Sequence, residues 1–231
     1  MTKSNAYRFL FYCTGLLILA MGLTLNTKAG LGVSPIISVS YSVSEIFDHN
    51  FGNMTLLLYT SFVVIEMAIH LLRGLRQKTP SLGIVLLLDF LQIPLSLVFT
   101  RFLNVFAGLI PDLASSGMSP HAEMTLRVIV LLCAILCTGI GAAMSLNMRL
   151  VPNPGDGIVQ TLADSLNKKV GLTKNCFDLT NIAITCALSL LCTGHIVGIG
   201  LGTLLAMVGV GRTIAVFNHL TENKLRAIAE H

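Results

Sequence analysis

Three charged residues lie inside long apolar stretches of the sequence: Glu66, Asp89 and Arg212. If those stretches cross a bilayer, an ionised side chain there costs about 2.5 to 3.5 kcal/mol on an insertion scale, which makes each a candidate for function. The carboxylates of Glu66 and Asp89 have the chemistry to take up a proton or to bind a cation. Arg212 could pair with either one, and the unpaired carboxylate would then carry the proton. The structural alternatives are a buried pair that fixes helix register, or snorkelling of Glu66 and Arg212 to the interface.

Two connections rich in glycine and proline form a second candidate site. In each, a residue of a helix-capping type precedes a proline, which suits the first helical position because its missing N–H would be unpaired there. We therefore expect short, non-spanning helices over residues 35–47 and 154–167. The two pairs are Ser34 with Pro35 and Asn153 with Pro154.

The N-termini of these short helices could bind an anion or a carboxylate, because their first N–H groups are free and the helix dipole is positive there. Asp156 would repel an anion, so we expect it to cap its own helix or to bind a cation or a proton. The alternative is that both helices lie flat on the membrane surface. Alternating serines at Ser38, Ser40, Ser42 and Ser44 show a strand-like period, but an isolated strand in lipid would leave backbone groups unpaired, so we expect helix or irregular structure buried in protein.

The elements that must position these residues are membrane helices. The 231 residues are 54% hydrophobic and only 11% charged, with a mean hydropathy of +0.80, whereas soluble chains are about 25% charged. This composition excludes a soluble globule, and the expected fold class is an all-α polytopic membrane protein with six spans. The predicted spans are residues 9–27, 54–72, 82–103, 125–147, 176–193 and 196–217.

The distribution of basic residues predicts the orientation of the chain, because cytoplasmic loops retain lysine and arginine. With the N-terminus inside, all but three of the 15 lysines and arginines lie on the cytoplasmic side, the exceptions being Lys28, Arg101 and Arg127. We therefore expect a multi-pass protein of the cell membrane with both termini in the cytoplasm.

A constant shift of 119 residues superimposes the first half of the chain on the second without a gap, aligning Gly22 with Gly141 and Pro35 with Pro154. Each half has three spans, an odd number, so the second copy should be inverted relative to the first. Inverted repeats of this kind recur in secondary transporters. The predicted division is a first repeat at residues 1–112, a second at 120–222 and a cytoplasmic tail at 223–231.

Small residues recur every four positions around the last span, a spacing that lets membrane helices approach closely. Packing within one chain and a homodimer face are both open for this stripe. Its members are Gly194, Gly198, Gly202 and Ala206.

Catalytic and metal-binding signals are missing from the sequence. It contains no His-Glu-x-x-His, no nucleophile elbow and no phosphate-binding loop, so we expect neither enzyme activity nor a cofactor. The six cysteines lie in apolar stretches and are interpreted as packing residues. His70 and His195 fall at span ends, where a solvated imidazole is ordinary, so no metal site is expected. The net charge of +4 includes no basic cluster, which argues against nucleic acid as a partner.

The segments Gly30-Leu31-Gly32-Val33-Ser34-Pro35 and Pro154-Gly155-Asp156-Gly157 resemble motifs of the bacterial YczE/YyaS/YitT group of small integral membrane proteins. The resemblance covers essentially the whole chain, although the tryptophan and aspartate of that group's first motif are absent here. It implies a bacterial cytoplasmic membrane and the fold described above. It implies no substrate, because the group lacks an established biochemical activity.

The duplication and the intramembrane acid favour a small secondary transporter or permease that works by alternating access. It would move an unknown small solute, with a proton as the expected coupling ion and Asp89 as the coupling carboxylate. Its partners would be the lipid bilayer and that solute or ion. The alternative is a non-catalytic accessory or regulatory protein that acts through a protein partner.

Overall fold

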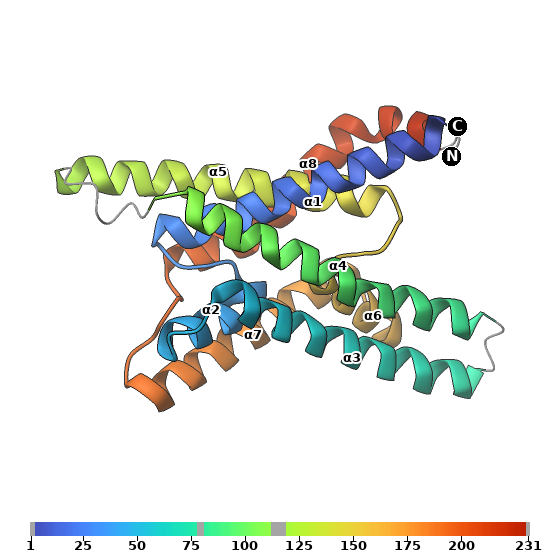
Figure 1. The fold of residues 1–231 in the computed structure, drawn as a ribbon, viewed down its shortest axis with the longest axis horizontal. Coiled ribbons are helices and arrows are strands. Elements are labelled where there is room, and N and C mark those ends of the chain that lie inside the picture. Colours follow the sequence, from blue (N-terminus) through green and yellow to red (C-terminus); the bar gives the residue numbers. More distant parts are fainter. Residues whose placement is uncertain (1–2, 78–80, 112–118, 230–231) are drawn as a thin grey trace. The chain divides into compact units, whose positions relative to one another are not determined.

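The computed structural model describes residues 3–77, 81–111 and 119–229, and all regular structure in these ranges is helical (Figure 1). Six helices are long and two are short. They follow the order long, short, long, long, and this order occurs twice along the chain. Their bounds are α1 Lys3–Ala29, α2 Pro35–Ile46, α3 Phe51–Gln77, α4 Leu82–Leu109, α5 Pro120–Asn147, α6 Pro154–Leu166, α7 Val170–Thr193 and α8 Leu201–Ala229.

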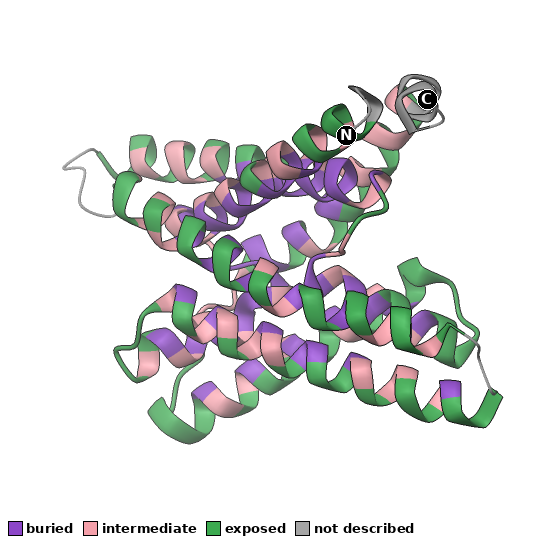
Figure 2. Ribbon diagram, turned by 45° about the vertical axis from the view of Figure 1, so that its right-hand side comes forward, coloured by how far each residue is buried: buried purple, intermediate pink, exposed green. Residues whose placement is uncertain are grey.

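The six long helices are each long and apolar enough to cross a membrane. They confirm the prediction of an all-α polytopic membrane protein with six spans. Large apolar side chains remain exposed on these helices, for example Leu57, Val64 and Leu72 of α3. Buried and exposed positions share the same helices (Figure 2), as expected when one face packs against protein and the other faces lipid.

The two short helices begin where the cap and proline signals predict, at Pro35 and Pro154. The serine period in the first of them is helical, not strand-like. Ser38 and Ser42, one turn apart, bond to Thr185 and Ser189 of α7 at 2.8 and 2.9 Å. Ser40, between them, instead contacts Thr55 of α3 at 3.1 Å, so the alternating pattern fits a helix buried between two neighbours.

The described residues divide into two compact units. Unit 1 contains α1, α5, α8 and the end of α4 from Phe102, and unit 2 contains α2, α3, α6, α7 and α4 up to Arg101. Each unit therefore draws helices from both of the halves that the sequence shift defines.

In unit 1, α1 and α5 run antiparallel and in close contact because glycines face each other's backbones. A Cβ on Gly22 would lie 2.5 Å from the backbone nitrogen of Thr138, and a Cβ on Gly15 would lie 2.8 Å from the backbone nitrogen of Ser145. Small residues of this kind allow helices to pack where no hydrophobic force drives them together. Further along, Ala29, Leu131, Ile135, Ala206 and Val210 form the buried core that α1 and α5 share with α8.

The predicted stripe of small residues is not one helical face, and the predicted start of the last span at residue 196 is too early. Gly194 and Gly198 have φ of +74° and +80°, and α8 begins only at Leu201. Glycine adopts this left-handed conformation without steric cost, so the chain turns there and does not continue a helix. Gly202 instead donates its N–H to the Leu31 carbonyl at 2.7 Å.

In unit 2, each short helix packs against both α3 and α7. The pairing of Ser38 with Thr185 and of Ser42 with Ser189 shows that α2 runs parallel to α7. Thr161 of α6 bonds to Glu66 and contacts His70, both of α3. The short helices thus carry hydroxyl groups into the interior of the unit.

Replacing Gly141 with alanine should destabilise unit 1. The new Cβ would lie 2.6 Å from the Gly15 carbonyl oxygen and would meet the Leu19 backbone, so the two helices must separate, at a cost of about 1 to 3 kcal/mol. Gly211 of α8 is the matched control, because a Cβ there meets nothing within 4 Å, and alanine raises helix propensity by about 1 kcal/mol. Thermal unfolding in detergent should place Gly141→Ala below the parent and Gly211→Ala at or above it. Equal midpoints for the two variants would contradict this packing.

Candidate functional site: a carboxylate and histidine cluster

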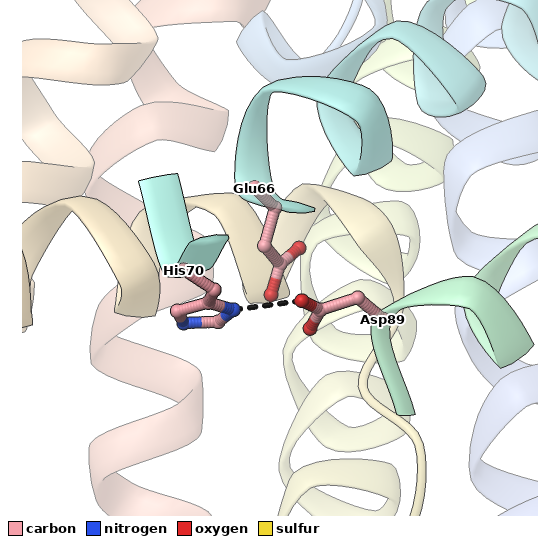
Figure 3. Close-up of side chains that lie close together, drawn as sticks. All are labelled: Glu66, His70 and Asp89. Atoms are coloured by element: carbon pink, nitrogen blue, oxygen red, sulfur yellow. Dashed lines mark hydrogen bonds and ion pairs between the residues drawn. The ribbon is translucent and has the colours of Figure 1, made fainter. Parts of the chain in front are cut away.

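Three ionisable side chains converge in the interior of unit 2. Glu66 and His70 lie four residues apart on α3 and therefore share one helix face, and Asp89 approaches from α4. Figure 3 shows the three side chains pointing toward one another. His70 Nδ1 and Asp89 Oδ2 lie 2.7 Å apart and form an ion pair or hydrogen bond.

A second set of polar groups holds the Glu66 carboxylate. The Gln92 amide donates to Glu66 Oε2 at 3.1 Å, and the Thr161 hydroxyl donates to Glu66 Oε1 at 3.0 Å. Thr161 Oγ1 also lies 3.2 Å from His70 Nε2. Which of these two atoms donates depends on the tautomer of His70. One network therefore joins α3, α4 and α6.

The position of the proton on His70 decides how the ring meets Asp89. An imidazole with a proton on Nδ1 donates to the Asp89 carboxylate at 2.7 Å. An imidazole with its only proton on Nε2 would set a lone pair against that carboxylate, and two acceptors at this distance repel unless a cation or a proton lies between them. A proton on Nδ1 or a cation beside it therefore satisfies both atoms.

Burial makes that requirement strong. Glu66 is 3% exposed and Asp89 is 4% exposed, while the His70 side chain is 22% exposed. Among the described residues, no lysine or arginine forms an ion pair with either carboxylate. Two buried carboxylates without a fixed cation are costly in a low-dielectric interior, so the charge must be balanced by protons or by a bound ion.

Gly157 of α6 leaves room for the cluster. A Cβ at this position would lie 2.9 Å from Glu66 Oε2 and 2.9 Å from Gln92 Oε1, so any side chain would displace both groups. Gln92 is fully buried, and its Oε1 has no hydrogen-bond partner within the described part of the chain. A free acceptor oxygen therefore borders the Glu66 carboxylate.

The cluster also has the composition of a metal site. Glu66, His70 and Asp89 each offer one ligand atom, and these atoms all lie within 4.8 Å of one another. The sequence predicts Glu66 and Asp89 as candidates but treats His70 as a solvated group at a span end, and it does not single out Gln92 or Thr161. The four-residue spacing of Glu66 and His70 was the available signal.

The remaining predicted site residues lie elsewhere. Arg212 belongs to unit 1 and its side chain is exposed, whereas the ion pair formed by Asp89 is with His70. Ser34 ends the first stretch of unit 1 and Pro35 begins α2 in unit 2. Both are buried.

At the start of α6, the backbone groups expected to be free for an anion are already bonded. The Asn153 side chain accepts from the Gly155 N–H at 3.1 Å, as an N-cap does. The N–H groups of Asp156 and Gly157 donate to the Asn153 carbonyl at 2.9 and 2.8 Å, and Pro154 has none. The cap prediction for Asn153 is confirmed, but the expected anion site lacks free donors here.

Asp156 is half-buried near a second charged group of unit 2. Lys174 of α7 bridges to Asp178 at 3.2 Å. Burial raises the pKa of Asp156 above its usual 3.8, the Lys174 charge lowers it, and Asp178 raises it further, so that the net shift is upward. Asp156 thus neighbours Lys174 and Asp178, and it does not cap its own helix, because Asn153 does.

The fold and the buried polar cluster define the protein as a polytopic α-helical membrane protein. The chain matches the Family of unknown function (DUF6198) over residues 6–219 and belongs to that family. No curated protein and no solved structure matches the chain significantly.

Replacing Asp156 with asparagine should stabilise the protein at neutral pH. Because its pKa is raised above 3.8 in the folded state, the carboxyl favours folding when protonated, below that value, and this contribution is lost as the pH rises. The midpoint of thermal unfolding in detergent should therefore be higher for Asp156→Asn than for the parent at pH 7, and the gap should narrow toward pH 4. Asp164→Asn, at an exposed position of the same helix, should show no such dependence. A constant gap at all pH values would oppose the assignment.

Proposed function

We propose that the protein is a small secondary transporter that moves a small solute across the cell membrane by alternating access, without chemical conversion. The observation that carries this proposal is the pair of buried carboxylates, Glu66 and Asp89, which share a membrane-helix interior with His70 and no lysine or arginine partner in the described residues. Intramembrane acids of this kind mark ion and substrate pathways.

The cluster supplies the coupling step in this proposal. A proton on His70 Nδ1 or on Asp89 Oδ2 joins these atoms in a hydrogen bond at 2.7 Å, and this proton is the proposed coupling ion. Asp89 is then the coupling carboxylate, and Glu66 is held ready by Gln92 and Thr161. Loading and release of the cation change the charge of a buried site, which gives the two conformations different stabilities.

An inverted duplication supports alternating access. In unit 1, Arg8 Nη2 donates to the Met148 carbonyl just after α5. Arg127, its partner at a shift of 119 residues, approaches Gly30 just after α1. Each arginine thus reaches the far end of the other half's first helix, as two oppositely oriented copies would require.

Contacts in unit 2 repeat at the same shift. The contact between Ser42 of α2 and Ser189 of α7 corresponds to the contact between Thr161 of α6 and His70 of α3. Ser38 with Thr185 likewise corresponds to the contact between Gly157 and Glu66. This recurrence supports two copies of one module that diverged, with hydroxyl pairs in one copy and charged groups in the other.

The resemblance to the YczE/YyaS/YitT group adds the proposed location. It supports a bacterial cytoplasmic membrane, and the basic residues support cytoplasmic termini. The bacterial membrane location and the cytoplasmic termini are parts of the proposal, as transport is.

Replacing Asp89 with asparagine should reduce transport to the background of empty vesicles, because the amide cannot carry the cation that couples the cycle. The protein would be reconstituted in proteoliposomes with a pH-sensitive dye inside, and a panel of amino acids, metabolites and inorganic ions would be added outside. A solute that moves protons with the parent protein should fail with Asp89→Asn and succeed with Asp164→Asn, an exposed carboxylate of α6. Unchanged flux and pH dependence in Asp89→Asn would remove Asp89 from the mechanism. If the parent moved nothing and co-purified with a stoichiometric protein, the accessory role would replace transport.

A further inference from the structure

We infer that Glu66, His70 and Asp89 bind one divalent transition-metal ion, with the carbonyl oxygen of Gln92 as a further donor. This ion would be the cation of the proposed function. Its role as cargo or coupling ion rests on that proposal. Binding itself does not require transport, so the two can be tested separately.

The donor atoms lie close to the geometry of a coordination shell. One atom from each of Glu66, His70 and Asp89 falls within 4.8 Å of the others. Two ligands at about 2.1 Å from the same ion are about 3.4 Å apart at the tetrahedral angle, so the widest pair needs to approach by about 1.4 Å. Rotation of a carboxylate about its side-chain bonds supplies a movement of that size.

Gln92 gives an independent reason to expect a metal ion and not a proton alone. Its Nε2 donates to Glu66 Oε2, which fixes the amide, because the reverse orientation would set its oxygen against the carboxylate. Its Oε1 is left without a donor in the described residues, on a residue that is fully buried. A metal ion would satisfy this oxygen directly, whereas a proton shared between His70 and Asp89 leaves it without a donor.

The free oxygen lies near the Glu66 carboxylate. Gln92 Oε1 and Glu66 Oε2 both lie 2.9 Å from the point that a Cβ on Gly157 would occupy. Glycine at this position keeps that point free of a side chain. The two oxygens can therefore face one ion.

The charge of the site matches a divalent ion. The carboxylates of Glu66 and Asp89 sum to two negative charges, and His70 is neutral when it ligates. One divalent ion brings the group to zero, whereas a monovalent ion leaves a buried charge with no lysine or arginine partner among the described residues. Neutrality favours the divalent ion at bilayer depth.

The ligand types select among divalent ions. Imidazole suits zinc, copper, iron and nickel better than magnesium or calcium, which prefer oxygen donors alone. Thr161 contacts His70 Nε2 at 3.2 Å and so leaves Nδ1 for the ion. A partner on the second ring nitrogen is a usual feature of metal-bound histidines, because it orients the ring and fixes its tautomer.

The test is a cobalt titration of the purified full chain in detergent, after a chelator wash and removal of any polyhistidine tag. Visible absorption of Co²⁺ reports its ligands directly. We expect saturation at one ion per chain, displacement by Zn²⁺, and no displacement by an excess of Mg²⁺ of about tenfold. Asp89→Asn and His70→Gln should weaken binding by about 100-fold or more. Asp164→Asn and His195→Gln, at exposed positions of the same unit, should bind as the parent does.

A further variant tests the site even if the ligand variants fail to fold. Gly157→Ala keeps every ligand and favours helix, but its Cβ displaces Glu66 Oε2 and Gln92 Oε1. It should weaken Co²⁺ binding by about tenfold while its thermal unfolding midpoint without metal is not lowered. Parent-like binding in a folded Gly157→Ala and a folded Asp89→Asn would place any bound ion elsewhere and overturn the inference.

The remaining outcomes separate binding from transport. No Co²⁺, Mn²⁺ or Zn²⁺ binding by the parent would overturn the metal inference, while proton-linked flux that depends on Asp89 would still support the transporter. Metal binding at the three residues without movement of any ion or solute in proteoliposomes would support the site and contradict the proposed function.

Discussion

The balance of charge around two buried carboxylates is the constraint on which the rest of unit 2 depends. Glu66 and Asp89 are almost fully shielded, and the groups near them are neutral or only conditionally charged: Gln92, Thr161 and His70. Neutral donors lower the cost of burying a carboxylate but do not cancel its charge. Protons or a bound cation must therefore balance the charge of this interior.

Glycine positions provide the space that this arrangement needs. Gly157 lets α6 approach α3 and α4 so closely that the Glu66 and Gln92 head groups occupy the region of a missing side chain. In unit 1, Gly22 allows α1 and α5 to meet backbone to backbone. Both serve the same physical need, since helices in lipid associate through close packing and polar contacts, and bulky side chains would prevent both.

Much of the fold could be predicted from the sequence, because hydropathy and capping act locally. The six spans and the starts of α2 and α6 depend on nearby residues alone, and so does the cost of burying Glu66 or Asp89. The partner of Asp89 depends on how α3 and α4 are rotated about their axes, which no single stretch of sequence encodes. His70 therefore seemed an end-of-span histidine, and Arg212 an available partner. The stripe from Gly194 failed for a different reason, since spacing does not reveal a left-handed backbone.

The divergence between the two proposed copies bears on how a cation could drive a conformational change. A ligand shifts an equilibrium only by the difference in its affinity for the two states. The hydroxyl pairs between α2 and α7 are neutral and complete without an ion. The corresponding contacts between α6 and α3 include the ionisable groups Glu66 and His70. In the proposed cycle, a cation would therefore act on only one of the two copies, and it would shift the equilibrium between the two conformations to the extent that this copy binds it more tightly in one of them.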